Sequence, residues 1–302
     1  MQPASSPRTS VVIPTRNRRT SLERLLSSLK NSNAIDELCR EIIVVNNAST
    51  DESEAFLEQA ARQWALLKVV SEPRPGKNYA LNKGLNRVKG EVICLMDDDI
   101  VLDPDWLVAL ARDYSDTAYD ALQPRVLAGV DPDGNKAEQR RLYYYNIPVI
   151  DYGEQVRDVR GLTGVIMSFR KAVFDNVGGF DERLPASGYH GDTEISNRIR
   201  AAGYRIGYTP HVVAYHELNP ERYGTSYARI SQYRKGLSRS LYGDDSLLGN
   251  VLPNLFANAI RYGVYRLRGR QAKTYKTEKR IMKYWGYFVG RIQRKLGKDP
   301  WV

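Results

Sequence analysis

The sequence is poor in cysteine and has no long apolar run. Its 302 residues include only Cys39 and Cys94, too few for the disulfide framework of a small secreted domain. No stretch of about 18 uninterrupted apolar residues occurs, and the N-terminal MQPASSPRTS lacks the charged-then-apolar pattern of a secretory signal. We therefore expect a protein of the reducing cytoplasm, with Cys94 as a small buried side chain.

Two phosphate-binding signatures are also missing. No Gly-x-Gly-x-x-Gly follows the first apolar segment and no Walker-type Gly-Lys-Ser/Thr occurs, which excludes a dinucleotide fingerprint and a P-loop. No internal repeat is present, so collagen-like and solenoid folds are excluded. With 42% hydrophobic and 26% charged residues, the composition is that of an ordinary globular protein with a substantial core.

The net charge of +10 comes from the C-terminal part of the chain. Residues 221–302 hold 18 Lys or Arg against 5 Asp or Glu, whereas residues 1–220 hold 27 against 30. Such a basic tail is consistent with a solvated surface, with contact to an anionic membrane or with contact to nucleic acid, because all three respond to the same field. Charge alone therefore leaves these three readings open.

Short β-branched runs alternate with amphipathic stretches between about residues 9 and 110. The predicted strands are SVVIPT, EIIVVNN, LLKVVSE and EVICLMDDD, and the predicted helices are SLERLLSSLK, ESEAFLEQAARQW and YALNKGLNRV. Thr20 or Ser21 marks the start of the first helix, and residues 49–51 can cap the second. This order predicts an α/β fold with a mostly parallel sheet and flanking helices.

Three of the predicted strands end in polar clusters, at residues 14–17, 46–51 and 97–99. Ligands of open α/β sheets bind beyond the carboxyl ends of the strands, so we expect these clusters to converge on one nucleotide pocket. The three adjacent carboxylates of residues 97–99 repel one another unless a cation or hydrogen-bond donors compensate. A divalent cation would do so and leave coordination positions for diphosphate oxygens. The alternative is an acidic cap on the helix that follows.

These segments resemble the GT-A glycosyltransferases, specifically glycosyltransferase family 2. The resemblance runs through SVVIPTRNR, IIVVNNASTD, PGKNYALNKGL and MDDDIVLDPDWL, and continues through GLTGVIMSFRKAVFDNVGGFDERL, GYHGDTEISNRIRAAGYRIGYTP and VVAYHE. It covers roughly residues 9–218 and implies a Rossmann-like GT-A catalytic domain. We expect this domain at residues 1–220, with a nucleotide-sugar half at about 9–110 and an acceptor half at about 111–220.

The resemblance assigns the nucleotide-sugar site to residues that follow the first two strands and to Lys77. Asn46 and Asn47 stand where the family usually has Asp-Asp or Asp-Asn, and an amide, which both donates and accepts, leaves the base less determined. Lys77 matches a basic residue that neutralises the diphosphate, although a solvated loop lysine is its alternative. The resemblance thus implies nucleotide-sugar contacts by Pro14, Thr15, Arg16, Asn17, Asn46, Asn47 and Lys77.

The family's Asp-x-Asp element implies that Asp98 contacts ribose or sugar, that Asp99 holds a divalent metal, and that Asp97 supports either one. His216 in VVAYHE matches a histidine that supplies a further metal ligand in many relatives, and imidazole suits Mn²⁺ better than Mg²⁺. A structural histidine is the alternative. The implied cofactor is Mn²⁺ or Mg²⁺.

The segment GYHGDTE resembles the family's Glu-Asp element beneath the acceptor, with Gly191 in place of the common Glu. Asp192 is then the matching catalytic base, which takes the acceptor's proton in an inverting transfer. An N-cap completed by Glu194 is the structural alternative, and His190 is a lesser alternative base. The tyrosines of residues 143–145 fit either sugar stacking or edge-strand packing.

The resemblance implies an inverting, metal-dependent hexosyltransferase that uses a nucleoside diphosphate sugar donor and a hydroxyl acceptor on a glycan, a lipid-linked molecule or a small molecule. Residues 221–302 read as basic, aromatic amphipathic helices that either brace the catalytic domain or contact an anionic inner membrane surface. Two other classes compete with this reading. A nucleotidylyltransferase would need a Gly-rich loop after the first strand, and a nucleic-acid-binding protein would leave the carboxylates without a purpose, so no nucleic-acid partner is expected.

Overall fold

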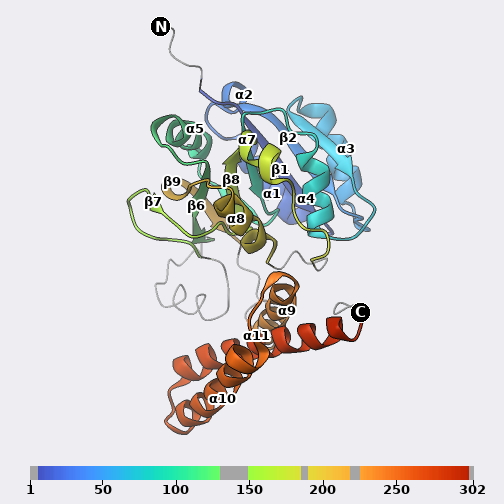
Figure 1. Ribbon diagram of the computed structural model, residues 1–302. Helices are drawn as coiled ribbons and strands as arrows, with labels where there is room; N and C mark the ends of the chain where they lie inside the picture. The colour runs from blue at the N-terminus through green and yellow to red at the C-terminus, as the bar shows by residue number, and fades with distance from the viewer. Residues whose placement is uncertain (1–5, 130–148, 185–189, 218–224, 299–302) are drawn as a thin grey trace. The chain divides into compact units, whose positions relative to one another are not determined.

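The computed structural model describes residues 6–129, 149–184, 190–217 and 225–298 (Figure 1). The chain divides into two compact units, and the second contains the described residues 225–298. The tyrosine cluster of residues 143–145 lies outside the described residues. The two units are presented separately below.

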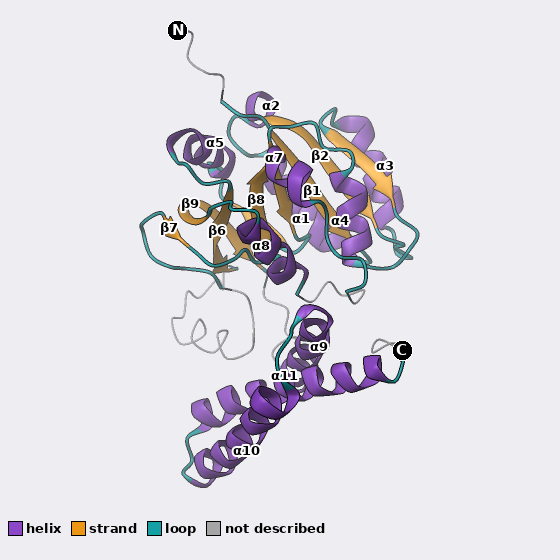
Figure 2. Ribbon diagram, in the orientation of Figure 1, coloured by secondary structure: helices purple, strands orange, loops and turns teal. Residues whose placement is uncertain are grey.

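The first unit is built on one mixed sheet with helices on both faces (Figure 2). Its strands are β1 (Thr9–Thr15), β2 (Cys39–Asn46), β3 (Leu67–Ser71), β4 (Val92–Met96), β5 (Ile100–Leu102), β6 (Ala121–Ala128), β7 (Arg157–Asp158), β8 (Ile166–Arg170) and β9 (Ile206–His216). Its helices are α1 (Arg19–Lys30), α2 (Ile35–Leu38), α3 (Ser53–Gln63), α4 (Lys77–Leu85), α5 (Trp106–Asp116), α7 (Lys171–Val177) and α8 (Gly191–Ala201).

The sheet combines a parallel half with a mixed half. The strand order is β3-β2-β1-β4-β8-β6-β9-β5, and β7 pairs with β9. Strands β1 to β4 pair in parallel, as the βαβ pattern predicts, whereas β8 runs antiparallel to both β4 and β6. The α/β fold class is confirmed, and among the described strands of the mixed half only β6 and β9 pair in parallel.

Alternate residues of the central strands pack on opposite faces of the sheet. Val11 and Ile13 of β1 belong to one core with α1 and α5, whereas Val12 belongs to the other core with α4 and α8. Helix α4 approaches the sheet so closely that a Cβ on Gly84 would overlap the side chain of Val12. Burial of both faces explains why these strands read as continuous apolar runs.

Both cysteines are free and buried, as expected for Cys94. Burial raises the pKa of Cys39 to about 12 and raises that of Cys94 further. Because the thiolate is the reactive form, both thiols are inert core side chains.

The helix starts differ slightly from the sequence expectation. Helix α1 begins at Arg19, one residue before Thr20, without a side-chain cap. Of the residues expected to cap α3, Asp51 accepts a hydrogen bond from the Ser53 backbone N–H at 3.0 Å. These contacts fix the loops that follow β1 and β2.

The second unit is helical, as predicted for this region. It contains α9 (Thr225–Tyr242), the short π-helical segment η2 (Leu247–Val251), α10 (Leu252–Leu267) and α11 (Gln271–Lys295). Helices α9 and α11 touch backbone to backbone, because a Cβ on Gly236 would overlap the carbonyl of Lys283 and one on Gly286 that of Tyr233. None of the described helices has the length and hydropathy needed to cross a membrane.

Candidate active site

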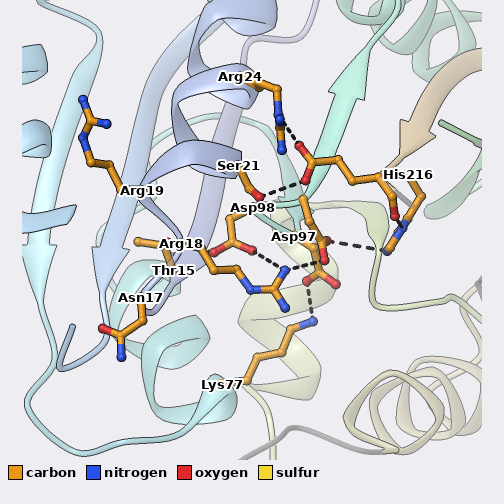
Figure 3. A network of polar contacts seen from close by, with 12 residues as sticks. Thr15, Asn17, Arg18, Arg19, Ser21, Arg24, Lys77, Asp97, Asp98 and His216 are labelled. Carbon is orange, nitrogen blue, oxygen red and sulfur yellow. Dashed lines mark hydrogen bonds and ion pairs between the residues drawn. The ribbon is translucent and has the colours of Figure 1, made fainter. Parts of the chain in front are cut away.

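Asp97 and Asp98, which follow β4, lie near Thr15 at the end of β1 (Figure 3). The Thr15 hydroxyl donates a hydrogen bond to Asp98 at 2.7 Å. The Arg18 guanidinium lies 2.5 Å from an Asp99 oxygen and 3.6 Å from an Asp98 oxygen. The structure therefore brings Thr15, Asp98 and Asp99 together, with Arg18 as their counter-ion.

Burial dominates the electrostatics of this acidic cluster. Asp98 and Asp99 are only 6% and 4% exposed. Burial raises the pKa of Asp98 to about 7, although the positive charge of Arg18 opposes this effect. Burial also raises the pKa of Asp97, against the charge of Lys77. A site that raises carboxylate pKa values in this way favours a bound cation.

Lys77 is part of the cluster and is not a solvated loop lysine. It begins α4, its ammonium donates to Asp97, and it lies 3.3 Å from the Gly164 carbonyl. Burial alone would lower its pKa, but the charge of Asp97 raises it. The Asp97 N–H bonds the Val165 carbonyl at 2.8 Å, which holds residues 164 and 165 at this place.

Asp192 reaches the same place from the first turn of α8. One carboxylate oxygen accepts the Gly164 N–H at 3.2 Å, and the other accepts the Thr193 N–H at 2.7 Å. Gly164 thus lies between Lys77 and Asp192. The N-cap position belongs to His190, and Glu194 pairs with Arg198 at 2.7 Å. The capping alternative is therefore absent from this turn, and the partly exposed Asp192 carboxylate lies next to Lys77.

His216 lies at the end of β9, and its donor set fits a divalent metal. Its Nδ1 is 2.8 Å from the Glu217 carbonyl, which can only accept, so Nδ1 carries a proton. Its Nε2 faces an Asp99 oxygen at 3.6 Å. A metal-bound histidine typically donates its other ring N–H to a carbonyl or carboxylate in this way, which leaves Nε2 and Asp99 as the two groups that would hold a cation.

No three His, Cys, Asp or Glu side chains within the described ranges form a complete metal-binding group. Asp99 and His216 would therefore supply two protein ligands. A two-ligand site leaves most positions of a hard cation for water and phosphate oxygens.

The loops after β1 and β2 are joined to each other. Asn17, with a positive φ of 54°, accepts the Thr50 N–H at 2.7 Å and donates its own N–H to Ser49 at 3.1 Å. Asn46 pairs with Thr15 in the sheet register and accepts the Ser49 N–H at 3.3 Å. Pro14 is buried within β1, whereas Arg16 is exposed. Of this predicted set, Thr15 has a side chain in direct contact with the acidic cluster.

The Asn47 side chain holds the backbone of residues 72–76 in place. Its amide donates to the carbonyls of Glu72 at 3.1 Å and Arg74 at 2.7 Å, and its oxygen accepts the Gly76 N–H at 2.7 Å. These bonds hold the segment that leads into Lys77. The amide is committed to this backbone, which differs from the nucleotide contact that the resemblance implies.

Comparison with known proteins identifies the family. The family model described as "Glycosyl transferase family 2" matches residues 10–178, which include the acidic cluster and Lys77. The chain belongs to glycosyltransferase family 2. This membership favours sugar transfer over the nucleotidylyltransferase and nucleic-acid-binding alternatives.

Related proteins agree with this assignment. The chain is 25% identical over 244 residues to the probable glycosyltransferase YdaM of Bacillus subtilis, covering 75% of this chain and 56% of YdaM. It is 24% identical over 215 residues to the glycosyltransferase AglE of Haloferax volcanii, covering 71% of this chain and 68% of AglE. The chain thus spans little more than half of YdaM.

Solved structures share the GT-A fold. The mannosyltransferase PcManGT of Pyrobaculum calidifontis, solved with GDP-Man and Mn²⁺, superposes with a TM-score of 0.65 at 20% identity and covers 97% of this chain and 89% of its own. GalNAc-T7, solved with UDP, GalNAc and Mn²⁺, gives a TM-score of 0.57 at 18% identity over 78% of this chain and 51% of its own. These likenesses support the fold.

One departure of this chain from the family pattern, Gly191, has a local explanation, and so does the Asn at position 47. A Cβ on Gly191 would lie 3.1 Å from the Asn78 side-chain oxygen and 3.3 Å from the Phe180 ring, so the common Glu does not fit there without displacing them. At position 47 the family pattern allows Asp or Asn, and only the Asn has an N–H to donate to the two carbonyls that Asn47 binds.

Asn47→Asp should destabilise the enzyme by about 2–4 kcal/mol, because it removes two donors and places a charge against two buried carbonyls. Asn46→Asp is the matched control, since both residues are 4% exposed and residue 46 would still accept the Ser49 N–H. Urea unfolding measures the difference. Equal losses in the two variants would contradict the bracing role of Asn47.

Asp98→Asn should change how the stability of the metal-free enzyme depends on pH. Because the folded-state pKa of about 7 lies above the ordinary value, folding favours the protonated form. The free energy of unfolding therefore falls as pH rises from about 4 to about 7. Above pH 7 the variant should be more stable than the wild type by on the order of 1 kcal/mol. Thermal unfolding in EDTA at several pH values measures this, and unchanged profiles would refute it.

Sequence reasoning missed two residues of the site, Arg18 and Glu217. Of the arginines in Arg16-Asn17-Arg18, only the second reaches the carboxylates, because the turn at Asn17 directs the chain into α1. Glu217 binds Ser21 at 2.8 Å and Arg24 at 2.6 Å, which ties the end of β9 to α1 (Figure 3). The position of Glu217 directly after His216 could have indicated that it lies near the site.

Proposed function

We propose that this glycosyltransferase moves one hexosyl group from a nucleoside diphosphate sugar to a hydroxyl acceptor, with inversion at the anomeric carbon. The observation that carries the proposal is the placement of Asp192 next to Lys77 and the acidic cluster around Gly164. Asp192 can then act as a base on the acceptor hydroxyl while Lys77 supplies positive charge to the leaving diphosphate of the same donor. Residues 1–220 form the catalytic domain in this proposal.

Asp192 acts as the base. The acceptor oxygen forms its bond to the anomeric carbon while the bond from that carbon to the diphosphate oxygen breaks, and the bonding electrons leave with the diphosphate. The acceptor's proton moves to an Asp192 carboxylate oxygen. The N–H groups of Gly164 and Thr193 hold this carboxylate in one orientation before the acceptor binds.

Lys77 and Arg18 supply positive charge on the donor side. Each is paired with a carboxylate of residues 97–99, so each is already fixed in position. Fixed charges of this kind stabilise a departing diphosphate without reorganising. Asp99 and His216 would hold a divalent metal, preferably Mn²⁺, whose charge would add to the same stabilisation.

Donor choice is tested with nucleotides directly. PcManGT is solved with GDP-Man and TarS of S. aureus with UDP-GlcNAc, which supports a nucleotide-sugar donor for this chain and leaves the base to experiment. Thermal unfolding with UDP, GDP, dTDP and their sugars, with and without Mn²⁺, should reveal one base that stabilises the enzyme only with Mn²⁺. Absence of stabilisation by every nucleotide would overturn the proposal.

For the C-terminal unit we propose contact with an anionic phospholipid surface at the inner face of the cytoplasmic membrane. Large apolar side chains recur every three or four residues along η2 and α10, and all are exposed, from 38% to 90%: Leu248, Leu252, Phe256, Ile260, Val264 and Leu267. Residues 247–277 contain six Lys or Arg and no Asp or Glu. An apolar stripe with basic flanks matches the interface of an anionic bilayer.

Phe256→Asp should lower sedimentation with phosphatidylglycerol-containing vesicles at least about tenfold, because it places a charge within the apolar stripe. Val108→Asp on α5, another exposed apolar position, is the matched control. Binding should also weaken as salt rises. If Phe256→Asp instead dissociates a dimer in analytical ultracentrifugation and vesicle binding is unchanged, the stripe is a contact between two copies and the membrane proposal fails.

A further inference from the structure

The C-terminal unit carries a cavity of about 330 Å³ that is open to solvent and lined by residues of this unit alone. Four basic side chains line it, Arg239 of α9, Arg261 of α10, and Arg280 and Lys283 of α11. One carboxylate, Asp245, lies among them. The close backbone contact of α9 with α11 at Gly236 and Gly286 fixes two walls of the cavity.

The positive charge of this cavity is largely uncompensated. Asp245 is already paired with Arg239 at 2.7 Å and accepts the Asn250 amide at 2.7 Å. Arg261, Arg280 and Lys283 make no ion pair within the described part of the chain. Burial and the charges of Arg239 and Lys235 lower the pKa of Lys283, with Asp245 opposing them. Such repulsion is relieved by an anion.

A neutral polar group also lacks a partner in the cavity wall. The side-chain oxygen of Asn258 is buried without a hydrogen bond among the described residues, while its amide donates to the Asn254 carbonyl at 2.7 Å. A buried acceptor needs a donor, which inorganic anions lack when fully ionised. A ligand hydroxyl beside an anionic group would satisfy both the cations and Asn258.

We propose that this cavity binds a phosphate-bearing ligand, with the phosphate on Arg261, Arg280 and Lys283 and an adjacent hydroxyl on Asn258. The ligand is a small phosphate ester or the headgroup of an anionic phospholipid. The charge-assisted hydrogen bonds that arginine and lysine make to phosphate are about twice as strong as neutral ones. The proposal is independent of the sugar-transfer reaction.

The test compares two double variants of the full chain that lose the same charge. Arg280→Gln with Lys283→Met removes two cations from the cavity, and Arg270→Gln with Lys276→Met removes two exposed cations elsewhere on the unit. Isothermal titration with inorganic phosphate and with sn-glycerol 3-phosphate should give at least about tenfold weaker binding for the cavity variant only. Its thermal stability without ligand should not fall, because repulsion is relieved.

Binding to phosphatidylglycerol vesicles distinguishes a phospholipid headgroup from a free phosphate ester as the ligand. Loss of vesicle binding in the cavity variant but not in the control assigns a lipid headgroup, whereas loss of glycerol phosphate binding alone assigns a free ester. Asn258→Leu should also weaken glycerol phosphate binding, because it removes the acceptor for the adjacent hydroxyl. Equal binding of both phosphates by the wild type and the two double variants would overturn the proposal, and nucleotide binding at the acidic cluster would be unaffected in either case.

Discussion

Asp192→Asn should lower kcat about 10²–10⁴-fold while the Kd for the donor nucleotide changes less than about twofold. The amide cannot accept the acceptor's proton, yet it preserves the size of the side chain at the start of α8. In the proposed site the nucleotide contacts lie on the loops after β1, β2 and β4, so donor binding should be unaffected. Steady-state kinetics with calorimetry of nucleotide binding separates the two quantities.

Glu194→Gln is the matched control for this result. The Glu194→Gln variant loses the same charge in the same helical turn, but the side chain of residue 194 faces Arg198 and not Gly164. The kcat of this variant should stay within about threefold of the wild-type value. An equal loss of donor affinity in Asp192→Asn would place Asp192 in the nucleotide pocket and contradict its role as the base.

Asp99→Ala should abolish Mn²⁺-dependent nucleotide binding and lower transfer at least about 10³-fold, because a bound metal contributes several kcal/mol to charge stabilisation. The fold should persist, since the change removes one of three mutually repelling carboxylates and leaves Arg18 with Asp98 at 3.6 Å. Electron paramagnetic resonance of free Mn²⁺ and nucleotide calorimetry measure the two losses.

Asp105→Ala serves as the control for Asp99→Ala. Asp105 belongs to the same acidic stretch, and its carboxylate accepts a hydrogen bond from the Asn33 amide at 2.6 Å. Its Mn²⁺ binding should match that of the wild type. Near-normal transfer by the purified Asp99→Ala variant would contradict a metal-binding role for the acidic cluster and would indicate that the cluster only caps a helix.

The parallel half of the fold could be predicted because its local signals agree with one another. Val11, Val12 and Ile13 all face core, so β1 appears as an unbroken apolar run, and the intervening helices have the 3.6-residue spacing. The mixed half could not be predicted in the same way. The antiparallel pairing of β8 with β4 joins residues at least 70 positions apart, and no local pattern encodes such a partner.

The acidic cluster could be predicted because the ends of parallel strands converge, which places Thr15 beside Asp98. The different contacts of Asn46 and Asn47 could not be predicted from the sequence. Side chains at successive positions of an extended chain point in opposite directions, and which one meets the 72–76 backbone depends on the path of that loop. Arg18 was missed for a similar reason, because the positive φ of Asn17 redirects the chain.

The most direct test of the account is the stereochemistry of donor turnover. Proton NMR of the sugar released or transferred from an α-linked nucleotide sugar, recorded before the anomers equilibrate, identifies the first anomer formed. A single displacement assisted by Asp192 predicts the β-anomer, formed at a rate that falls about 10²–10⁴-fold in Asp192→Asn. Formation of the α-anomer, or a β-anomer rate unchanged in that variant, would contradict the proposed mechanism.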